Sequence, residues 1–283
     1  MGEGAIERFM SLDAFPQPDL IQVKYPIVLM HGFGMAGSFW RNGHMHDLAM
    51  SLRSHGVIAY APNVTPYNTV PVRASIWQQR IAYVLQETKA EKVNLIAHSM
   101  GGLDARYLIS ANDFHGKIAS LTTIATPHHG SSIATFLLEQ PGKLREWLAE
   151  FANWMGTKVM REVESDFLNT VTELTPEYLN NEFNPNVPDH PDVLYWSYAA
   201  QAGKDTQVSV TPFLKPLNYI MFGREGKNDG FVSVESAKWG IFRGIIEADH
   251  AQQIGMNFPT TRSNFDPSAF FCSLTQNLSD AGC

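Results

Sequence analysis

The sequence has only two cysteines and no long apolar run. Cys272 and Cys283 are too few for a disulfide framework or for a cysteine-based zinc site. We interpret them as two inert thiols, with a disulfide between them as the alternative. No apolar stretch approaches the roughly 20 residues of a membrane-spanning helix, and residues 1–25 lack the basic start and the apolar core of a signal peptide. We therefore expect a soluble protein without a transmembrane segment, either cytoplasmic or secreted by a route that the sequence does not reveal.

Charged residues are also scarce. Asp, Glu, Lys and Arg make up 17% of the 283 residues, against about 25% in a typical soluble protein. Acidic residues outnumber basic ones, 28 to 21, and the sequence has no block of Lys or Arg. Proteins that bind a phosphate backbone present a basic surface. The composition therefore argues against a nucleic-acid partner.

Apolar residues are abundant: 44% of the chain is hydrophobic and 11% is aromatic. This content is enough for a large core. Four short segments rich in β-branched residues lack polar alternation, as strands buried on both faces do. They cover residues 25–30, 56–61, 92–97 and 120–125. Helical spacing over residues 75–89 and 100–111 alternates with them. This order predicts an α/β fold with a mostly parallel central sheet flanked by helices, and we expect residues 1–283 to form a single domain.

Residues 131–190 interrupt this alternation, and we predict that they form an inserted helical lid or cap. Within residues 143–155, apolar side chains including Trp147 and Phe151 recur at helical spacing on one face, while charged side chains occupy the other. A second pattern of this kind covers residues 159–168. The functional interpretation is an apolar cover over a binding site, with Trp147 and Phe151 as candidate substrate-binding residues. The alternative is two ordinary packed helices.

Three further strands are predicted after the insertion, over residues 193–198, 217–222 and 239–246. A turn at residues 226–230 follows the second of these strands, and His250 follows the third. Open α/β sheets gather their ligands at the carboxyl ends of strands. Polar residues in these two loops are therefore candidates for a site.

The sharpest local signal is the segment Ala97-His98-Ser99-Met100-Gly101, in which a predicted strand runs directly into a predicted helix. Small residues on both sides of the serine are what such a tight turn requires, although the common form of the motif, G-x-S-x-G, has glycine where Ala97 stands. The turn exposes the serine Oγ at a helix N-terminus, where free N–H groups and the helix dipole favour a developing anion. We predict that Ser99 is a catalytic nucleophile.

A nucleophilic serine needs a base, and the base needs an acid that orients it. In the strand-turn-helix setting the chain order is serine, acid, histidine, which favours Asp229 and His250. Asp249 and Glu235 are rival acids. An aspartate next to the histidine in sequence points away from its ring too often to be the better partner of Nδ1, so we predict Asp229.

The other histidines fit this order less well. His128 and His129 follow Ser99 too closely, and His44 and His46 precede it. His44 and His46 could bind a metal ion, but a surface loop is the favoured interpretation, and no HExxH motif is present. We predict no metal and no cofactor.

A tetrahedral intermediate also needs two donors for its oxyanion. The residue after the nucleophile, Met100, supplies one backbone N–H. The second donor usually comes from the loop after the first central strand, where Gly32 and Gly34 flank Phe33 and allow a close approach of the backbone. We predict that the N–H groups of Phe33 and Met100 form an oxyanion hole.

Four blocks of this sequence resemble the α/β-hydrolase lipases, in the branch that contains the fungal triacylglycerol lipases and the bacterial Proteus- and Pseudomonas-type lipases. The blocks are residues 31–33, 93–107, 123–131 and 228–240. The resemblance covers most of the chain. It implies a carboxylester hydrolase fold with Ser99, Asp229 and His250 as catalytic triad and with a helical lid.

One position departs from that family. The Pseudomonas-type lipases have an aspartate two residues after the triad histidine as a calcium ligand, and this sequence has Gln252 there. A neutral amide is a poorer ligand for a hard cation than a carboxylate. The departure agrees with the prediction that no metal is required.

The sequence therefore predicts a serine carboxylester hydrolase that cleaves fatty acyl esters such as triacylglycerols through an acyl-enzyme. Its partner would be an acyl ester lipid, met in solution or transiently at a lipid–water interface. An acyltransferase or a thioesterase would use the same triad. A non-catalytic receptor or scaffold with this fold is a third alternative, disfavoured because all three triad residues are present.

Overall fold

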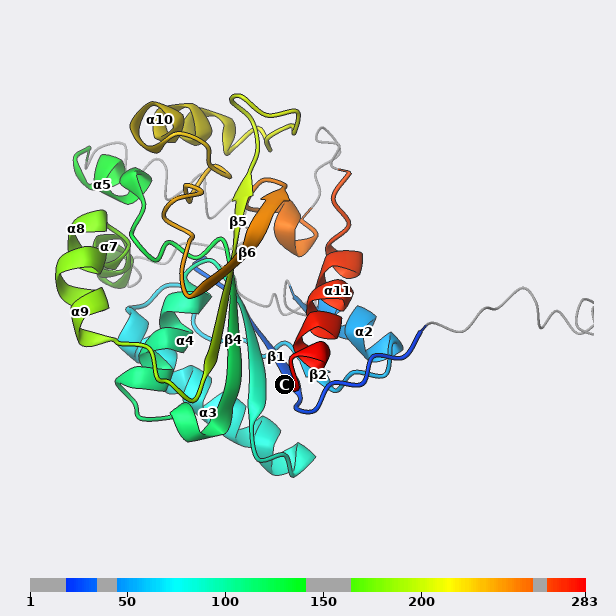
Figure 1. Cartoon of the computed structure of the whole chain (residues 1–283). Helices are drawn as coiled ribbons and strands as arrows, with labels where there is room; N and C mark the ends of the chain where they lie inside the picture. The colour runs from blue at the N-terminus through cyan, green and yellow to red at the C-terminus, as the bar shows by residue number, and fades with distance from the viewer. Residues whose placement is uncertain (1–18, 35–44, 141–163, 257–263) are drawn as a thin grey trace, which may run out of the picture.

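The computed structural model describes residues 19–34, 45–140, 164–256 and 264–283 (Figure 1). Its centre is one six-stranded sheet in which every pairing is parallel, in the order β2-β1-β3-β4-β5-β6. The strands are β1 (Ile27–Met30), β2 (Ala59–Tyr60), β3 (Val93–His98), β4 (Ile118–Ile124), β5 (Leu194–Gln201) and β6 (Ile241–Glu247). The predicted parallel α/β architecture is confirmed.

Helices cover both faces of this sheet, because the side chains of each strand alternate between two apolar layers. In β1, Ile27 and Leu29 pack with α2 (His46–Ser54) and α11 (Pro267–Asp280). Val28 and Met30 pack on the other side with α3 (Val70–Thr88) and α4 (Gly101–Ser110). Figure 1 shows these two pairs of helices on opposite sides of the sheet.

The regular elements that the structure describes between β4 and β5 are all helical, and loops join them. Its elements are α5 (Ser132–Leu138), α7 (Glu164–Glu173), α8 (Pro176–Tyr178), the π-helical turn η4 (Leu179–Phe183) and α9 (Asn184–Asn186). Phe167 of the second predicted pattern is fully buried. Residues 143–155, with Trp147 and Phe151, lie outside the described residues, so the cap and its two substrate-binding residues stay predictions.

One predicted strand is wrong. Residues 217–222 belong to α10 (Lys215–Glu225), which begins with a proline in its first turn. Leu217 and Met221 are buried one helical turn apart, whereas Tyr219 between them is 54% exposed. A short apolar run fits a strand and a helix segment equally well by its pattern alone. This segment precedes the loop that carries Asp229.

The remaining elements are two single turns, η2 (His115–Lys117) and η5 (Gln252–Ile254). Cys272 and Cys283 are free thiols, which agrees with the interpretation of two unpaired cysteines. Among the described helices, none combines the length and the apolar character needed to cross a membrane.

Candidate active site

Ser99 lies on a sharp turn between β3 and α4, where only Ser99 and Met100 separate the strand from the helix. The backbone of Ser99 has φ +58°, a left-handed conformation that is costly for a residue with a side chain. Ser99 N–H donates to Ile124 O over 2.9 Å, and Thr126 Oγ1 donates to Ser99 O over 2.7 Å. These bonds to the end of β4 hold the turn in its strained shape.

Glycines after the serine allow α4 to start this close to β1. A Cβ added at Gly101 would lie 2.8 Å from Met30 O, and one added at Gly102 would collide with the Thr126 side chain. Both contacts are closer than real Cβ atoms approach. Packing against the end of β1 and against Thr126 therefore requires glycine at both positions of this tight turn.

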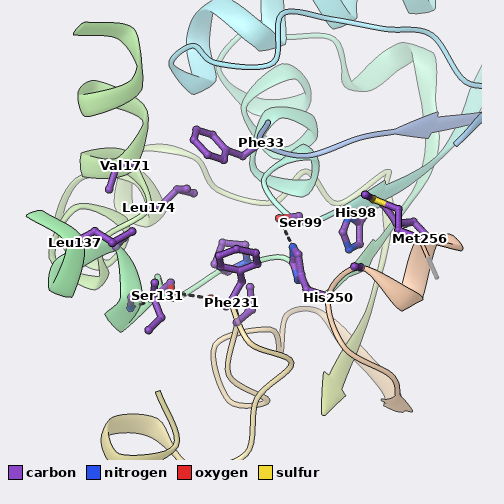
Figure 2. A pocket seen from close by; sticks show the side chains of 16 residues that line it. Phe33, His98, Ser99, Ser131, Leu137, Val171, Leu174, Phe231, His250 and Met256 are labelled. Atoms are coloured by element: carbon purple, nitrogen blue, oxygen red, sulfur yellow. Dashed lines mark hydrogen bonds between the residues drawn. The ribbon is translucent and has the colours of Figure 1, made fainter. Parts of the chain in front are cut away.

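The structure brings Ser99, His250 and Asp229 together in one chain of hydrogen bonds. Ser99 Oγ lies 2.9 Å from His250 Nε2, and His250 Nδ1 lies 2.7 Å from Asp229 Oδ2. Figure 2 shows the contact between Ser99 and His250. Asp229 is fully buried, and His250 is 9% exposed. A carboxylate at Nδ1 favours the imidazole tautomer whose free Nε2 can accept a proton from the serine.

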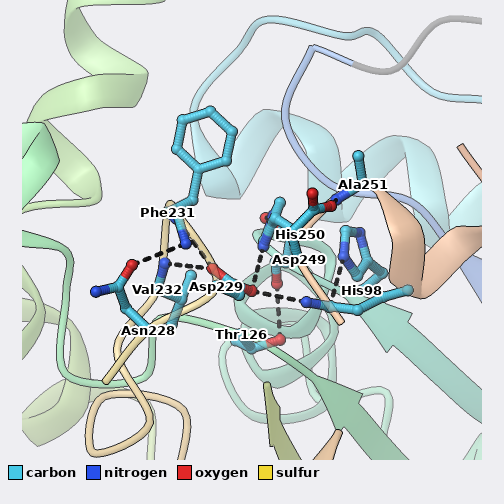
Figure 3. Close-up of polar contacts among 12 residues, drawn as sticks. His98, Thr126, Asn228, Asp229, Phe231, Val232, Asp249, His250 and Ala251 are labelled. Carbon is cyan, nitrogen blue, oxygen red and sulfur yellow. Dashed lines mark hydrogen bonds and ion pairs between the residues drawn. The ribbon is translucent and has the colours of Figure 1, made fainter. Parts of the chain in front are cut away.

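Asp229 lies in the loop after α10. The sequence had suggested that this loop follows a strand. Its other oxygen, Oδ1, accepts hydrogen bonds from the N–H groups of Phe231 at 3.0 Å and Val232 at 2.8 Å (Figure 3). Asp229 O also accepts the His250 N–H at 3.0 Å. The carboxylate is thus fixed by its own turn, while the backbone ties that turn to the histidine.

The two rival acids lie elsewhere. Asp249 accepts hydrogen bonds from the N–H groups of Thr211, Ala251 and Gln252, at 2.6, 3.0 and 2.9 Å. Burial raises its pKa. Glu235 is an exposed residue that pairs with Lys238 over 2.6 Å. Neither carboxylate is recorded in contact with His250, so the choice of Asp229 agrees with the geometry.

The loop after β1 packs directly against the serine. A Cβ added at Gly32 would lie 2.6 Å from Ser99 Cβ and 3.0 Å from Ser99 Oγ, so glycine is needed there. Arg73 Nη2 donates to His31 O at 2.9 Å and to Gly32 O at 3.3 Å. In a trans peptide unit the C=O and the following N–H point in opposite directions. With its carbonyl held by Arg73, the Gly32–Phe33 peptide therefore directs the Phe33 N–H away from the guanidinium.

Arg73 was missed by the sequence analysis. Its guanidinium is fully buried and donates from Nε to Asp104 Oδ2 at 2.9 Å, and burial raises the pKa of Asp104 to about 6 despite this neighbour. Arg73 lies among Val70, Ala74 and Trp77 on the buried face of α3. A charged residue on the apolar face of a helix is the signal that could have revealed it, because buried charges need partners.

An apolar pocket opens beside Ser99 and His250. Besides these two residues and the polar His98 and Ser131, its lining consists of Phe33, Pro127, Ile133, Ala134, Leu137, Val171, Leu174, Phe231, Val232, Ala251, Ile254 and Met256. No Asp, Glu, Lys or Arg is among the described lining residues. In Figure 2, Leu137, Val171 and Leu174 lie on one side of Ser99 and Met256 on the other. Apolar side chains thus line the pocket on both sides of the serine.

Both polar atoms of the Gln252 amide hydrogen-bond to protein groups. Its Oε1 accepts the Asp249 N–H at 2.9 Å, and its Nε2 donates to Ser209 O at 3.2 Å. Within residues 19–34, 45–140, 164–256 and 264–283 there is no cluster of three or more His, Cys, Asp or Glu suited to a metal ion. Independence from metal stays a prediction.

Glu173, at the end of α7 beside the pocket residue Leu174, is a buried carboxyl group with pH-dependent consequences. Its Oε2 accepts the Val70 N–H at the start of α3 over 2.6 Å. Burial raises the pKa of Glu173 to about 7, although this hydrogen bond lowers it. The folded state favours the protonated form of Glu173. Its contribution to the free energy of unfolding is therefore complete below the ordinary pKa of 4.5 and is lost as the pH rises towards 7.

We therefore expect Glu173→Gln, which can still accept the Val70 N–H, to melt a few degrees above the wild type at pH 8.5 and at nearly the same temperature at pH 5. A shift of about 2–4 °C corresponds to 1 kcal/mol in a domain of this size. Thermal unfolding at both pH values measures the effect. Glu177→Gln, at an exposed position of α8, is the control and should show no such difference. A Tm shift of Glu173→Gln that is equal at both pH values would contradict the assignment.

Residues 26–187 match the family described as palmitoyl protein thioesterase. Among curated proteins, triacylglycerol lipase 2 of Saccharomyces cerevisiae is 31% identical over 79% of this chain, and the match covers 65% of the yeast protein. The triacylglycerol lipase of Pseudomonas fragi is 25% identical over 93% of this chain and 99% of its own length. This chain spans less than two thirds of the yeast relative and about half of two further bacterial triacylglycerol lipases.

Solved structures show the same fold. The mature form of the Bacillus licheniformis lipase BlEst2 superposes with a TM-score of 0.67 at 21% identity, covering 92% of this chain and 96% of the lipase. A metagenomic carboxyl esterase superposes with a TM-score of 0.71 at 17% identity, covering 95% of this chain and 80% of the esterase. Since the family match covers more than half of the 283 residues, the chain belongs to the palmitoyl protein thioesterase family, and it has the α/β-hydrolase fold of lipases and esterases.

Proposed function

We propose that this protein hydrolyses carboxylic esters of fatty acids, with Ser99, His250 and Asp229 as its catalytic triad. The observation that carries the proposal is the chain of hydrogen bonds from Ser99 through His250 to Asp229. Ser99 and His250 line an apolar pocket with no Asp, Glu, Lys or Arg among its described lining residues. The hydrogen-bonded triad is suited to acyl transfer, and the apolar pocket is suited to an aliphatic acyl chain.

In the proposed reaction, Ser99 Oγ attacks the ester carbonyl carbon while His250 Nε2 takes the serine proton. The N–H groups of Phe33 and Met100 donate to the oxyanion that forms. When the tetrahedral intermediate collapses, the C–O bond to the alcohol breaks, and His250 returns the proton to the leaving oxygen. Water then attacks the acyl-enzyme in the same way and releases the fatty acid and Ser99.

The pocket supports an acyl lipid as substrate. Each methylene transferred from water to an apolar environment contributes about 0.8 kcal/mol, and a pocket lined by residues such as Leu137, Val171 and Leu174 provides that environment. A phosphorylated carrier such as coenzyme A would need cationic partners, and no Lys or Arg is among the described lining residues. Triacylglycerols, which the names of the curated relatives specify for those proteins, are the proposed natural substrate class.

A series of p-nitrophenyl esters from acetate to palmitate, together with an emulsified triglyceride, tests the proposal. We expect kcat/KM to rise with chain length from acetate and the emulsion to be hydrolysed. A protein that cleaves none of these esters would refute the hydrolase, and one that cleaves acetate best would refute the acyl-lipid substrate.

Thioester hydrolysis is the second candidate, because the family description names a thioesterase. The same triad can attack a thioester carbonyl, with a thiolate as leaving group. An oxygen ester and a thioester with the same palmitoyl chain and similar leaving groups distinguish the two activities. We expect the ratio of their kcat/KM values to favour the oxygen ester, and the reverse ratio would support the thioesterase.

Leu137 offers a test of where the acyl chain lies. It is 4% exposed, belongs to α5 and lies on the pocket wall away from Met256 (Figure 2). We expect Leu137→Trp to fill this part of the pocket and to exclude about three methylenes of a long chain, which lowers kcat/KM for palmitate by about 50-fold relative to butyrate. Leu138→Trp, on the same helix but not among the pocket residues, is the control. An equal loss for both esters would place the acyl chain elsewhere.

A further inference from the structure

Gln253 contacts the proposed triad at its acid, Asp229. It lies on η5, the turn that follows His250, and its side chain is fully buried. Its Nε2 donates to Asp229 Oδ2 at 2.8 Å, the same oxygen that His250 Nδ1 contacts. Its Oε1 lies 3.1 Å from His98 Nε2. One amide therefore joins the acid to a second histidine.

The hydrogen-bonding capacities of Asp229, Gln253 and His98 determine where the protons lie. A carboxylate only accepts hydrogen bonds, so the NH2 group of Gln253 must face Asp229 and its oxygen must face His98. His98 then has to donate, which places its proton on Nε2. The two contacts thus select one neutral tautomer of His98, in addition to supplying Asp229 with a donor.

The tautomer matters because His98 lies against the proposed base. The ring centroids of His98 and His250 are 4.5 Å apart (Figure 3 shows both residues). Burial, with a smaller contribution from His250, holds the pKa of His98 well below its ordinary value. A charged His98 at this distance would oppose the positive charge that His250 acquires when it takes the serine proton.

We infer that Gln253 is a positioning residue, which holds the carboxylate of Asp229 and the neutral Nε2–H tautomer of His98 so that His250 is the only one of the two rings that becomes charged during turnover. The inference rests on the proposed function of the triad. The titratable side chains at the amide are Asp229 after α10 and His98 at the end of β3. His250 and, from the loop after β1, His31 interact with His98, and Asp249 precedes η5.

Two substitutions of Gln253 separate positioning from packing. Gln253→Leu removes the donor and the acceptor, and we expect kcat to fall about tenfold at every pH with little change in KM. Protonated Glu has the shape of Gln, with an O–H for Asp229 and a C=O for His98. Because two carboxyl groups in contact resist ionising together, this proton is retained to higher pH than usual. The kcat ratio of Gln253→Glu to wild type should therefore be near one at about pH 5 and should fall about tenfold by about pH 9.

Gln252→Leu is the matched control. Gln252 is also buried on η5, but within the described residues its amide hydrogen-bonds to Asp249 N and Ser209 O and not to the triad. We expect it to lose thermal stability like Gln253→Leu and to keep kcat within about threefold of wild type. A Gln253→Glu ratio that does not change with pH, or equal kcat values for the two Leu variants, would overturn the inference.

Nitrogen NMR of the imidazole rings gives a readout that needs no substrate. The wild type should show His98 neutral with its proton on Nε2, as should Gln252→Leu, whereas Gln253→Leu should lose this single tautomer. If no ester is hydrolysed, the proposed function fails, and the NMR result still decides the positioning role. A His98 proton on Nδ1 in the wild type, or an unchanged His98 in Gln253→Leu, would overturn that role.

Discussion

Replacing Ser99 with alanine should abolish ester hydrolysis while the protein stays folded. Without the hydroxyl no acyl-enzyme can form, and kcat is expected to fall by about 10⁵- to 10⁶-fold, with a residual rate due to substrate binding and the oxyanion donors. The turn should persist, because its bonds to Ile124 and Thr126 use only the backbone of residue 99. Hydrolysis of p-nitrophenyl butyrate and a circular dichroism spectrum measure the two properties.

Ser131→Ala is the control for this substitution. Ser131 also lines the pocket, but its Oγ donates to Phe231 O at 2.7 Å, and no contact with His250 is recorded for it. Its removal should cost less than about tenfold in kcat. Full activity in a folded Ser99→Ala protein would refute the nucleophile, and a comparable loss in Ser131→Ala would show that the assay responds to pocket shape.

Replacing Asp229 with asparagine should lower kcat by about 10³- to 10⁴-fold, the loss known for a triad acid converted to its amide. An amide can present its NH2 group to His250 Nδ1, and this favours the imidazole tautomer that carries its proton on Nε2 and cannot accept the serine proton. The backbone donors Phe231 N and Val232 N can still bind the amide oxygen. We therefore expect the fold to survive, as measured by the Tm.

Asp249→Asn distinguishes the two aspartates nearest to His250 in this loop region. Asp249 is buried and bonded to Thr211, Ala251 and Gln252 through backbone N–H groups. Its conversion to asparagine should lower the Tm and leave kcat within about tenfold of wild type. If the two variants show the opposite order of activity, the acid is Asp249 and the role of Asp229 is structural.

The site predictions that agree with the geometry are those with a local cause. Ser99 follows from one strand, one turn and one helix, each visible in a window of a few residues. Asp229 and His250 follow from chain order once the serine is assigned, although α10 was taken for a strand. That error left the acid in place because a turn follows this segment in either conformation.

The parts that the sequence did not predict depend on contacts between distant segments. Arg73 is close to Gly32 because α3 packs on the face of the sheet that carries Val28 and Met30 of β1. Gln253 on η5 and His98 on β3 are 155 residues apart in the chain, and the folded sheet brings them together. Hydrogen bonds of this kind have no periodicity, so a pattern of residues does not reveal them.

The place of β6 at the edge of the sheet links local opening to activity. This strand has β5 as its only partner in the described sheet, and Ile241 and Ile245 are 53% and 45% exposed. Edge elements with exposed apolar side chains exchange their amide hydrogens through openings that need less free energy than global unfolding. His250 follows β6 closely, so each such opening would carry the histidine away from a serine that stays anchored between β3 and α4. Mild denaturant should therefore abolish the proposed ester hydrolysis while most of the sheet remains native.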